Sequence, residues 1–323
     1  MELVSPSLDH TDVIRAAFKI RSHIRNTPIV TRANDGIALK LECLQHTGAY
    51  KVRGALNAVL SLKEQGRLQP IVAASAGNHS SGIAWAAKIA GMSAYVVVPT
   101  NTPQKKLRNA EALGARIIQH GDNFDEALIY AQALAKQNTW SFVHAFDDSK
   151  VIAGQGTLAF ELLSHNPKNV FVPIGGGGLI SGLSLILRKH NINLIGVQVK
   201  GSTAFSRYFA KDYREEKPKN TIADGVRVTK PGSLCTQLSR GQIDRFVVVS
   251  EQDVKSAIAD LYLNNGIICE GAGALGLAAA QKLSLPRSLV VVTGGNIDRD
   301  MLEQVVNDSQ SRVPPSFQRS KAG

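Results

Sequence analysis

The sequence predicts an α/β protein of two lobes, each a mostly parallel sheet flanked by helices. Short apolar runs alternate with longer amphipathic segments along most of the chain, which is the pattern of strand–helix–strand units. Aliphatic residues prevail over aromatic ones, which are only 6% of the sequence, as expected for helices stacked on a buried parallel sheet. A length of 323 residues suits one large domain or two closely joined ones with an ample core.

The chain is expected to begin with an amphipathic helix over residues 8–26, which Thr27-Pro28 ends. Extended segments and a helix follow it, at 29–30, 37–40 and 50–64. The next residues, 66–70, are polar and contain glycine and proline, so we expect the chain to cross into a second lobe there.

Residues 68–145 are expected to form the smaller domain, and 1–67 together with 146–323 the larger one. In the smaller domain, strands are predicted at 71–74, 94–99, 116–119 and 142–144, with helices at 82–90, 103–113 and 122–137 between them. In the larger domain, strands are predicted at 169–174, 194–199, 246–249 and 288–292, and helices at 151–164, 179–190, 251–265 and 271–282. Residues 214–220 are expected to be a charged surface loop, and the polar tail from Ser309 is expected to fray.

Composition excludes several classes of protein. No apolar run approaches the roughly 20 residues that span a bilayer, and residues 1–6 have no signal-peptide pattern, so no membrane association is expected. The net charge of +11 comes from dispersed basic residues without interleaved aromatics, which indicates a solvated basic surface and no nucleic-acid site. Three cysteines without metal or disulfide spacing point to a reducing cytoplasm.

Lys51 is the candidate catalytic residue, at the centre of Thr47-Gly48-Ala49-Tyr50-Lys51-Val52-Arg53-Gly54-Ala55. It falls in the first turn of a predicted helix. Burial there disfavours the ammonium form and lowers the pKa, as a lysine that forms imines requires, and the positive helix terminus adds to this. Spacing alone also allows an ordinary surface lysine.

A run of glycines, Gly175-Gly176-Gly177-Gly178, lies between a predicted strand and a predicted helix. Consecutive glycines let backbone N–H groups turn toward one anion at the helix N-terminus, although the run could also be a tight turn. A dinucleotide-binding oxidoreductase would need an acid about 20 residues on, where this chain has Gln198 and Lys200. The Gly-Lys-Ser/Thr ending of a P-loop is absent too.

A second loop at a helix start, Ser75-Ala76-Gly77-Asn78-His79, is a candidate site for a carboxylate. The alternative is an ordinary helix cap. His79 is expected to be structural.

These motifs resemble the threonine dehydratase and serine racemase family. The stretch around Lys51 is similar to its T-G-S-F-K-x-R-G-A segment, and Ser75–His79 to its S-[SA]-G-N-H loop. Further matches follow in the family's order: I-A-G-Q-G-T at 152–157, the segment 221–226 and Thr293-Gly294-Gly295-Asn296. The resemblance runs from about Thr27 to Asp298. It implies a pyridoxal 5′-phosphate (PLP) enzyme of fold type II, with the cofactor in the cleft between the lobes.

The resemblance also implies a role for each motif. Lys51 would carry PLP as a Schiff base, and Thr293 would hydrogen-bond its pyridine nitrogen. The phosphate would lie on Gly175, Gly176, Gly177, Gly178 and Leu179. Asn78 would contact the 3′-hydroxyl, and the substrate carboxylate would be held by Ser75, Ala76, Gly77, Asn78 and His79.

Ala76 favours elimination over racemisation. Serine racemases have a serine there that protonates the second face of the substrate carbanion, and alanine cannot do so. Thr293 is a neutral partner for the pyridine nitrogen, which weakens the electron sink and shortens the life of a carbanion. No metal site is expected, because the positions of the racemase cation ligands hold Gln198 and Ala204, which are not carboxylates. Glu270 is a candidate helix cap.

We therefore interpret the chain as a PLP-dependent ammonia-lyase that dehydrates and deaminates L-threonine or L-serine to a 2-keto acid. The alternatives are a 3-hydroxyaspartate dehydratase, a serine or aspartate racemase, a dinucleotide-dependent oxidoreductase, and a PLP-binding or basic-surface interaction protein without catalysis. The partners expected are a small amino-acid substrate and, as is usual in the resembled family, a second copy of the chain in a homodimer.

Overall fold

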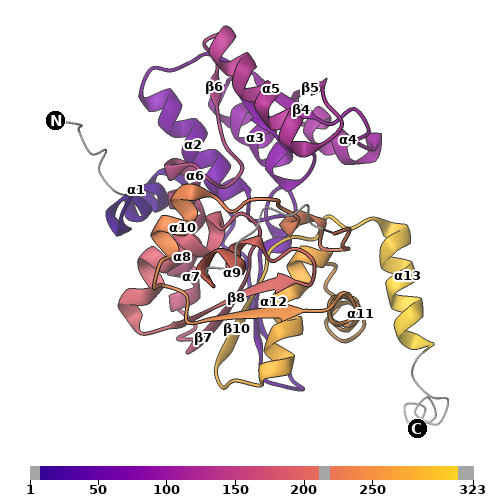
Figure 1. The fold of residues 1–323 in the computed structure, drawn as a ribbon. Helices are drawn as coiled ribbons and strands as arrows, with labels where there is room; N and C mark the ends of the chain where they lie inside the picture. Colours follow the sequence, from indigo (N-terminus) through magenta and orange to yellow (C-terminus); the bar gives the residue numbers. More distant parts are fainter. Residues whose placement is uncertain (1–7, 211–218, 312–323) are drawn as a thin grey trace.

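Two separate sheets, one in each of two lobes, form the framework of the molecule (Figure 1). The computed structural model describes residues 8–210 and 219–311. The larger sheet has six strands in the order β1-β2-β10-β7-β8-β9, and the smaller has four in the order β5-β4-β3-β6. The predicted α/β class and mostly parallel sheets are confirmed.

The smaller sheet is entirely parallel and is built from consecutive strand–helix units. Its strands β3 and β4 are apolar and almost wholly buried, as central strands of a covered sheet are. Gly91 ends helix α3 in the left-handed region with a φ of 72°. The elements are β3 (Ile71–Ala74), α3 (Asn78–Ala90), β4 (Ala94–Val98), α4 (Gln104–Ala112), β5 (Arg116–Gln119), α5 (Phe124–Gln137) and β6 (Ser141–Phe142).

The larger sheet has one antiparallel strand, β1, at its edge. Its strand β10, which comes last along the chain, lies between β2 and β7. The strands are β1 (Ile29–Thr31), β2 (Ala38–Leu41), β7 (Asn169–Pro173), β8 (Asn193–Val199), β9 (Arg245–Val249) and β10 (Ser288–Val292). The remaining helices of the molecule are α1 (His10–Ile20), α2 (Val52–Glu64), α6 (Ser149–Gly156), α7 (Leu158–Leu163), α8 (Gly178–Leu187), α9 (Ala204–Phe209), α10 (Ser233–Ser239), α11 (Glu251–Asn265), α12 (Gly271–Leu283) and α13 (Arg299–Gln310), with 3₁₀ turns η1 (Glu42–Leu44), η2 (Arg188–His190) and η3 (Asp224–Val226).

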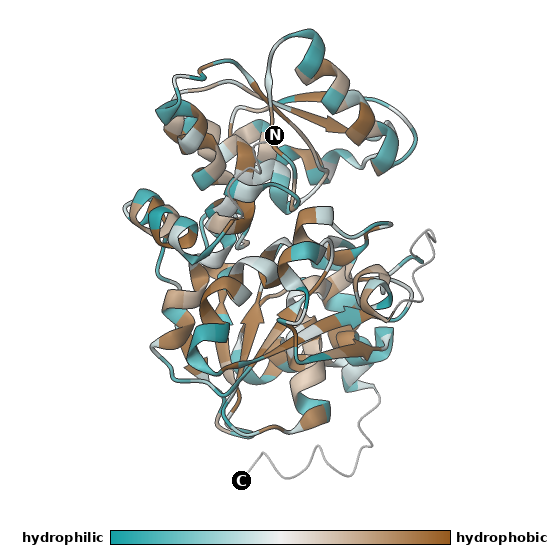
Figure 2. Ribbon diagram, turned by 60° about the vertical axis from the view of Figure 1, so that its left-hand side comes forward, coloured by the Kyte–Doolittle hydropathy of each residue, from teal (hydrophilic) through white to brown (hydrophobic). Residues whose placement is uncertain are grey.

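Helix α2 packs with the smaller lobe. Its residues Ala55, Leu56 and Val59 share one buried cluster with β3, α3 and β4, together with Val151 of α6. Figure 2 shows the corresponding hydropathy pattern, with the strands of both sheets mostly apolar. Because Lys51 directly precedes α2, the helix places this residue where the two lobes meet.

Several elements differ from the prediction. Helix α1 ends at Ile20 and gives way to turns, and the helix expected over 151–164 is interrupted at Thr157, between α6 and α7. Helices α9, α10 and α13 were not predicted, and α13 continues through Ser309, where fraying was expected. The expectations for residues 1–6, 214–218 and 312–323 lie outside the described residues. No described helix is long and apolar enough to cross a membrane.

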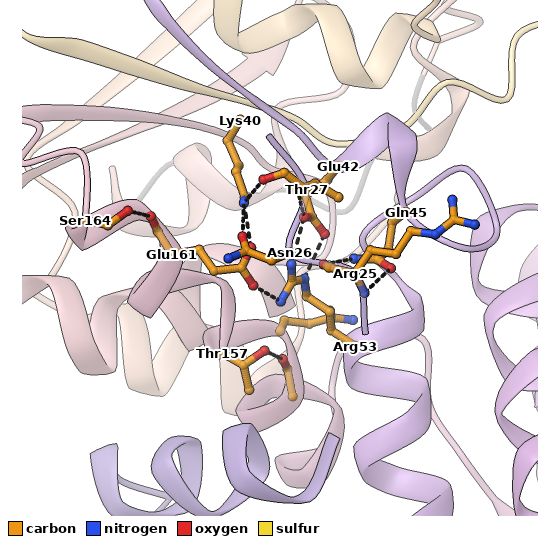
Figure 3. A network of polar contacts seen from close by, with 12 residues as sticks. Arg25, Asn26, Thr27, Lys40, Glu42, Gln45, Arg53, Thr157, Glu161 and Ser164 are labelled. Carbon is orange, nitrogen blue, oxygen red and sulfur yellow. Dashed lines mark hydrogen bonds and ion pairs between the residues drawn. The ribbon is translucent and has the colours of Figure 1, made fainter. Parts of the chain in front are cut away.

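A buried ionic network supports the region around Lys51 (Figure 3). Arg53 makes two hydrogen bonds of 2.8 Å to Glu42 and an ion pair of 2.7 Å to Glu161. Lys40 reaches the other oxygen of Glu161 at 2.5 Å, and the Thr27 hydroxyl donates to Glu42 at 2.6 Å. Two cations thus balance two carboxylates, which is what buried charges require.

Candidate active site

Lys51 is the N-cap of α2 and is partly buried. Its Nζ donates a 2.9 Å hydrogen bond to the carbonyl oxygen of Ala145, on the segment that leads back from the smaller lobe. Burial lowers the pKa of Lys51 to about 8, and the nearby Cys235 and Glu270 only partly oppose this. The expectation of a lysine with a lowered pKa at a helix start agrees with this geometry.

The loop of Ser75 to His79 starts helix α3, with Gly77 as its N-cap. The N–H of Gly77 donates to the hydroxyl of Ser75 at 3.2 Å. Among the described residues, the backbone N–H groups of Ala76, Asn78 and His79 have no acceptor. Three such donors at the start of a 13-residue helix form a suitable site for a carboxylate.

His79 is 2% exposed, and its Nε2 lies 3.3 Å from the carbonyl oxygen of Val143. Its Nδ1 has no partner among the described residues. Burial, and then the charge of Lys51, lower the pKa of His79 to about 3, so the ring is neutral. This environment fits a structural histidine beside the lysine.

Asn78 joins the two lobes through its side-chain amide. Its Nδ2 donates to Oε1 of Glu270 at 2.7 Å, and its Oδ1 accepts from Nδ2 of Asn296 at 2.7 Å. Asn296 in turn donates to the carbonyl oxygen of Thr47 at 2.8 Å. Four segments that are far apart in the sequence therefore meet around this one amide.

The glycine run lies at the start of α8, with Gly177 in the left-handed region at a φ of 104°. A Cβ on Gly176 would lie 2.3 Å from the ring of Phe146, and one on Gly177 would lie 2.2 Å from Phe205. Space for neighbouring side chains therefore requires glycine here in any case. The N–H groups of Gly175, Gly176 and Gly177 have no acceptor among the described residues, and α8 has no side-chain cap.

Thr293 follows β10 and is buried, and its carbonyl oxygen accepts from the N–H of Tyr50, the residue before Lys51. No described residue hydrogen-bonds its hydroxyl. A bridge between Ala49 and Gly294 fixes the two segments side by side. Lys51 and Thr293 are thus held near each other by backbone pairing.

These residues fit PLP as a group. The free N–H donors at the start of α8 suit the phosphate group of PLP. Lys51, an amine of lowered pKa, suits its aldehyde, with which it can form an imine. The hydroxyl of Thr293 suits its pyridine nitrogen. Leu179 is buried in the first turn of α8. Sequence reasoning did not find Ala145, Phe146 or the bond of Glu270 to Asn78. These depend on contacts between distant segments, so no local signal reveals them.

The candidate cation positions do not offer a metal site. The side chain of Gln198 is held by hydrogen bonds with Ser202 and Ser206. Among the described residues, no three His, Cys, Asp or Glu side chains form a group that could hold a metal ion. Glu270 is the N-cap residue of α12, as expected, although its side chain makes no capping hydrogen bond.

Two parallel-sheet lobes, a lysine at the start of a helix where they meet and a glycine run at the start of another define a PLP enzyme of fold type II. The family described as "Pyridoxal-phosphate dependent enzyme" matches residues 20–294. The chain belongs to this family, and its predicted cofactor is confirmed.

The similar proteins include a threonine dehydratase, a threonine deaminase and a serine racemase. A catabolic L-threonine dehydratase of Staphylococcus aureus is 38% identical over 316 residues, with 91% of each chain covered. The crystal structure of a T.th. threonine deaminase is similar with a TM-score of 0.83 and 33% identity, over 90% of this chain and 99% of the other. A maize serine racemase is similar with a TM-score of 0.86 and 28% identity, over 94% and 98%.

Proposed function

We propose that this protein catalyses the dehydration and deamination of a β-hydroxy amino acid, with L-threonine and L-serine as the first candidates. The observation that carries the proposal is Lys51, an amine of lowered pKa beside a loop of free N–H donors that contains alanine at position 76. The dehydratase and deaminase relatives support the same reaction.

The chain's own groups have distinct tasks in this proposal. The N–H groups of Ala76, Asn78 and His79 bind the substrate carboxylate, and those at the start of α8 bind the cofactor phosphate. PLP, when bound, supplies the electron sink that acidifies the Cα–H bond. Lys51 then removes the Cα proton, a C=C bond forms as the β-hydroxyl leaves, and hydrolysis of the released enamine gives the 2-keto acid and ammonia.

Racemisation is the second candidate, because the fold is also that of a serine racemase. Ala76 argues against it, since no side chain at this position can protonate the opposite face. A third candidate is dehydration of 3-hydroxyaspartate, whose extra carboxylate suits a basic protein with a net charge of +11.

One experiment separates these candidates. The purified protein, loaded with PLP, is given L-threonine, L-serine and both diastereomers of 3-hydroxyaspartate, and keto acid, ammonia and enantiomers are measured together. We expect keto acid and ammonia in equal amounts from threonine or serine. D-serine accumulating as fast as pyruvate would overturn the proposal.

We also propose that the division at residues 67/68 and 145/146 separates the two domains, and that the protein is a cytoplasmic homodimer. The strands of the smaller sheet all come from 71–142, and three buried free cysteines suit a reducing compartment. Light scattering coupled to size exclusion tests the dimer, for which we expect twice the mass of one chain.

A further inference from the structure

Glu270 is a buried carboxylate for which the proposed reaction has no use. It is 8% exposed, and a Cβ on Gly294 would lie 2.4 Å from its Oε1, so the surrounding backbone is tightly packed. Its Oε1 accepts the 2.7 Å hydrogen bond from Asn78. Asn78 belongs to the loop that is proposed to hold substrate and cofactor.

The bond from Glu270 determines which way the amide of Asn78 faces. An ionised carboxylate only accepts hydrogen bonds, so the NH₂ group of Asn78 must face it. The amide oxygen then faces the NH₂ group of Asn296, as observed. A protonated carboxyl group can donate as well as accept, so it no longer enforces a single orientation.

An ion pair between the lobes lies next to Glu270. Lys106 of α4 reaches Asp224 of η3 at 2.5 Å, and both side chains are half exposed. The next residue, Gly225, packs on Glu270, because a Cβ there would lie 3.7 Å from Oε1. Asp224 thus adjoins a residue that packs on Glu270, and the ion pair holds Lys106 beside Asp224.

Several titratable groups act on this carboxylate. Burial, and then the charge of Asp224, raise the pKa of Glu270 to about 7, while the bond from Asn78 and the charges of Lys106 and Lys51 oppose the shift. The other titratable groups that interact with it are Cys43, Tyr50 and Cys269.

We propose that Glu270 is a positioning residue for Asn78, and that the Lys106–Asp224 pair sets the pH at which it acts. The inference rests on the proposed function only in that Asn78 is taken to face the cofactor. The physical step is the change of Glu270 from a group that only accepts hydrogen bonds to one that also donates them.

The first test compares Glu270→Gln with Glu270→Ala. Glutamine, like the protonated carboxyl group, both accepts and donates hydrogen bonds and has no proton to lose, so kcat/KM should stay at its low-pH level and lose its inflection near pH 7, while PLP affinity should fall less than in Glu270→Ala. Alanine should weaken PLP binding by about tenfold or more, the effect of losing a hydrogen bond to a charged group. An unchanged inflection in Glu270→Gln would overturn the proposal.

The second test moves the inflection from a distance. Asp224→Asn removes a negative charge and should lower the pH at which the inflection in kcat/KM occurs. Lys106→Met removes a positive charge and should raise that pH. Each shift should be about half a unit at low salt and smaller at high salt. The control is Glu303→Gln, which breaks an exposed ion pair to Arg299 on α13 and should shift nothing. Shifts in the same direction for both variants would contradict the assignment.

A third readout needs no catalysis. In PLP-free protein, the raised pKa means that ionisation of Glu270 costs stability as the pH rises from the unfolded value, about 4.5, to about 7. The difference in melting temperature, Glu270→Gln minus wild type, should therefore be larger at pH 8 than at pH 5. A difference that does not vary with pH would overturn the inference, whereas absence of elimination with every amino acid would overturn only the proposed function.

Discussion

At Lys51, a single amine is subject to two opposing influences. Burial favours the neutral form, whereas the nearby Cys235 and Glu270 favour the ammonium form and only partly offset burial. With a pKa of about 8, the amine becomes mostly neutral in mildly alkaline solution. A surface lysine, with a pKa near 10.4, would not.

Replacing Lys51 with alanine should therefore lower turnover by about 10³-fold or more, because the general base is lost. The variant should also lack the absorption band that borohydride bleaches in the wild type. Lys189→Ala, at an exposed lysine next to α8, is the control and should behave as wild type. Substantial keto-acid formation by a folded Lys51→Ala protein would refute the assignment.

Ala76 is the residue on which the choice of reaction depends. Ala76→Ser should raise racemisation of serine by about 10²-fold or more, since a positioned acid typically contributes that much. Dehydration should persist. The measurement is chiral chromatography of serine beside a pyruvate assay, and no gain in D-serine would show that another feature of the site suppresses racemisation.

At the scale of elements, the helix that carries Lys51 depends on the ionic network of Figure 3. Burial raises the pKa of Glu42, but the charge and hydrogen bonds of Arg53 outweigh burial and hold it below its ordinary value. The stability this contributes is present above the unfolded pKa and is lost as the pH falls through the folded one.

Glu42→Gln should then cost about 3 kcal/mol at pH 7, because it leaves part of the charge of Arg53 unbalanced in the interior. The cost should shrink as the pH falls below the ordinary carboxyl pKa of 4.5, because the unfolded wild type then takes up a proton at Glu42 that the folded wild type, with its lowered pKa, does not. Urea unfolding at pH 7 and pH 4 measures both values. An equal loss at the two pH values would mean that ionisation of Glu42 contributes nothing.

The glycine run has two functions that a substitution would disturb together. Gly176→Val should weaken PLP binding, and the 2.3 Å contact with Phe146 means that it should also lower the melting temperature of PLP-free protein. Gly66→Ala, which strains a left-handed turn in open space, is the control, since it should lower stability and leave PLP affinity unchanged. Wild-type PLP affinity in Gly176→Val would place the phosphate elsewhere.

The sequence predicted both sheets because buried strands and helix starts carry local patterns. Helix α13 also has such a pattern, with Leu302, Val305 and Val306 buried at helical spacing and Asp298 as N-cap, and it was overlooked. The hydrogen bond between Asn78 and Glu270 leaves no local pattern in the sequence, since 192 residues separate them. Motif resemblance located the loops of the site, but only folding in three dimensions identifies the contacts between them.

At the scale of the whole molecule, the two loops proposed to hold the cofactor belong to different lobes. PLP should therefore slow amide exchange in both segments, 75–79 and 175–179. It should also stabilise the whole protein against unfolding, by about 2.7 kcal/mol at a hundredfold excess over Kd, and so raise the melting temperature. Exchange mass spectrometry with and without PLP provides the measurement. Protection confined to one loop would mean that the cofactor does not bridge the lobes.

The central place of β10 in the larger sheet affects how the chain folds while it is being translated. Strand β2 emerges early, but its inner neighbour β10 is synthesised after every other described strand of both sheets, and until then β2 and β7 cannot join one sheet. Strands β3 to β6 are contiguous and can pair well before. The inner edges of β2 and β7 therefore stay unpaired until β10 has been made, so Lys51 and Thr293 meet only after β10 has emerged.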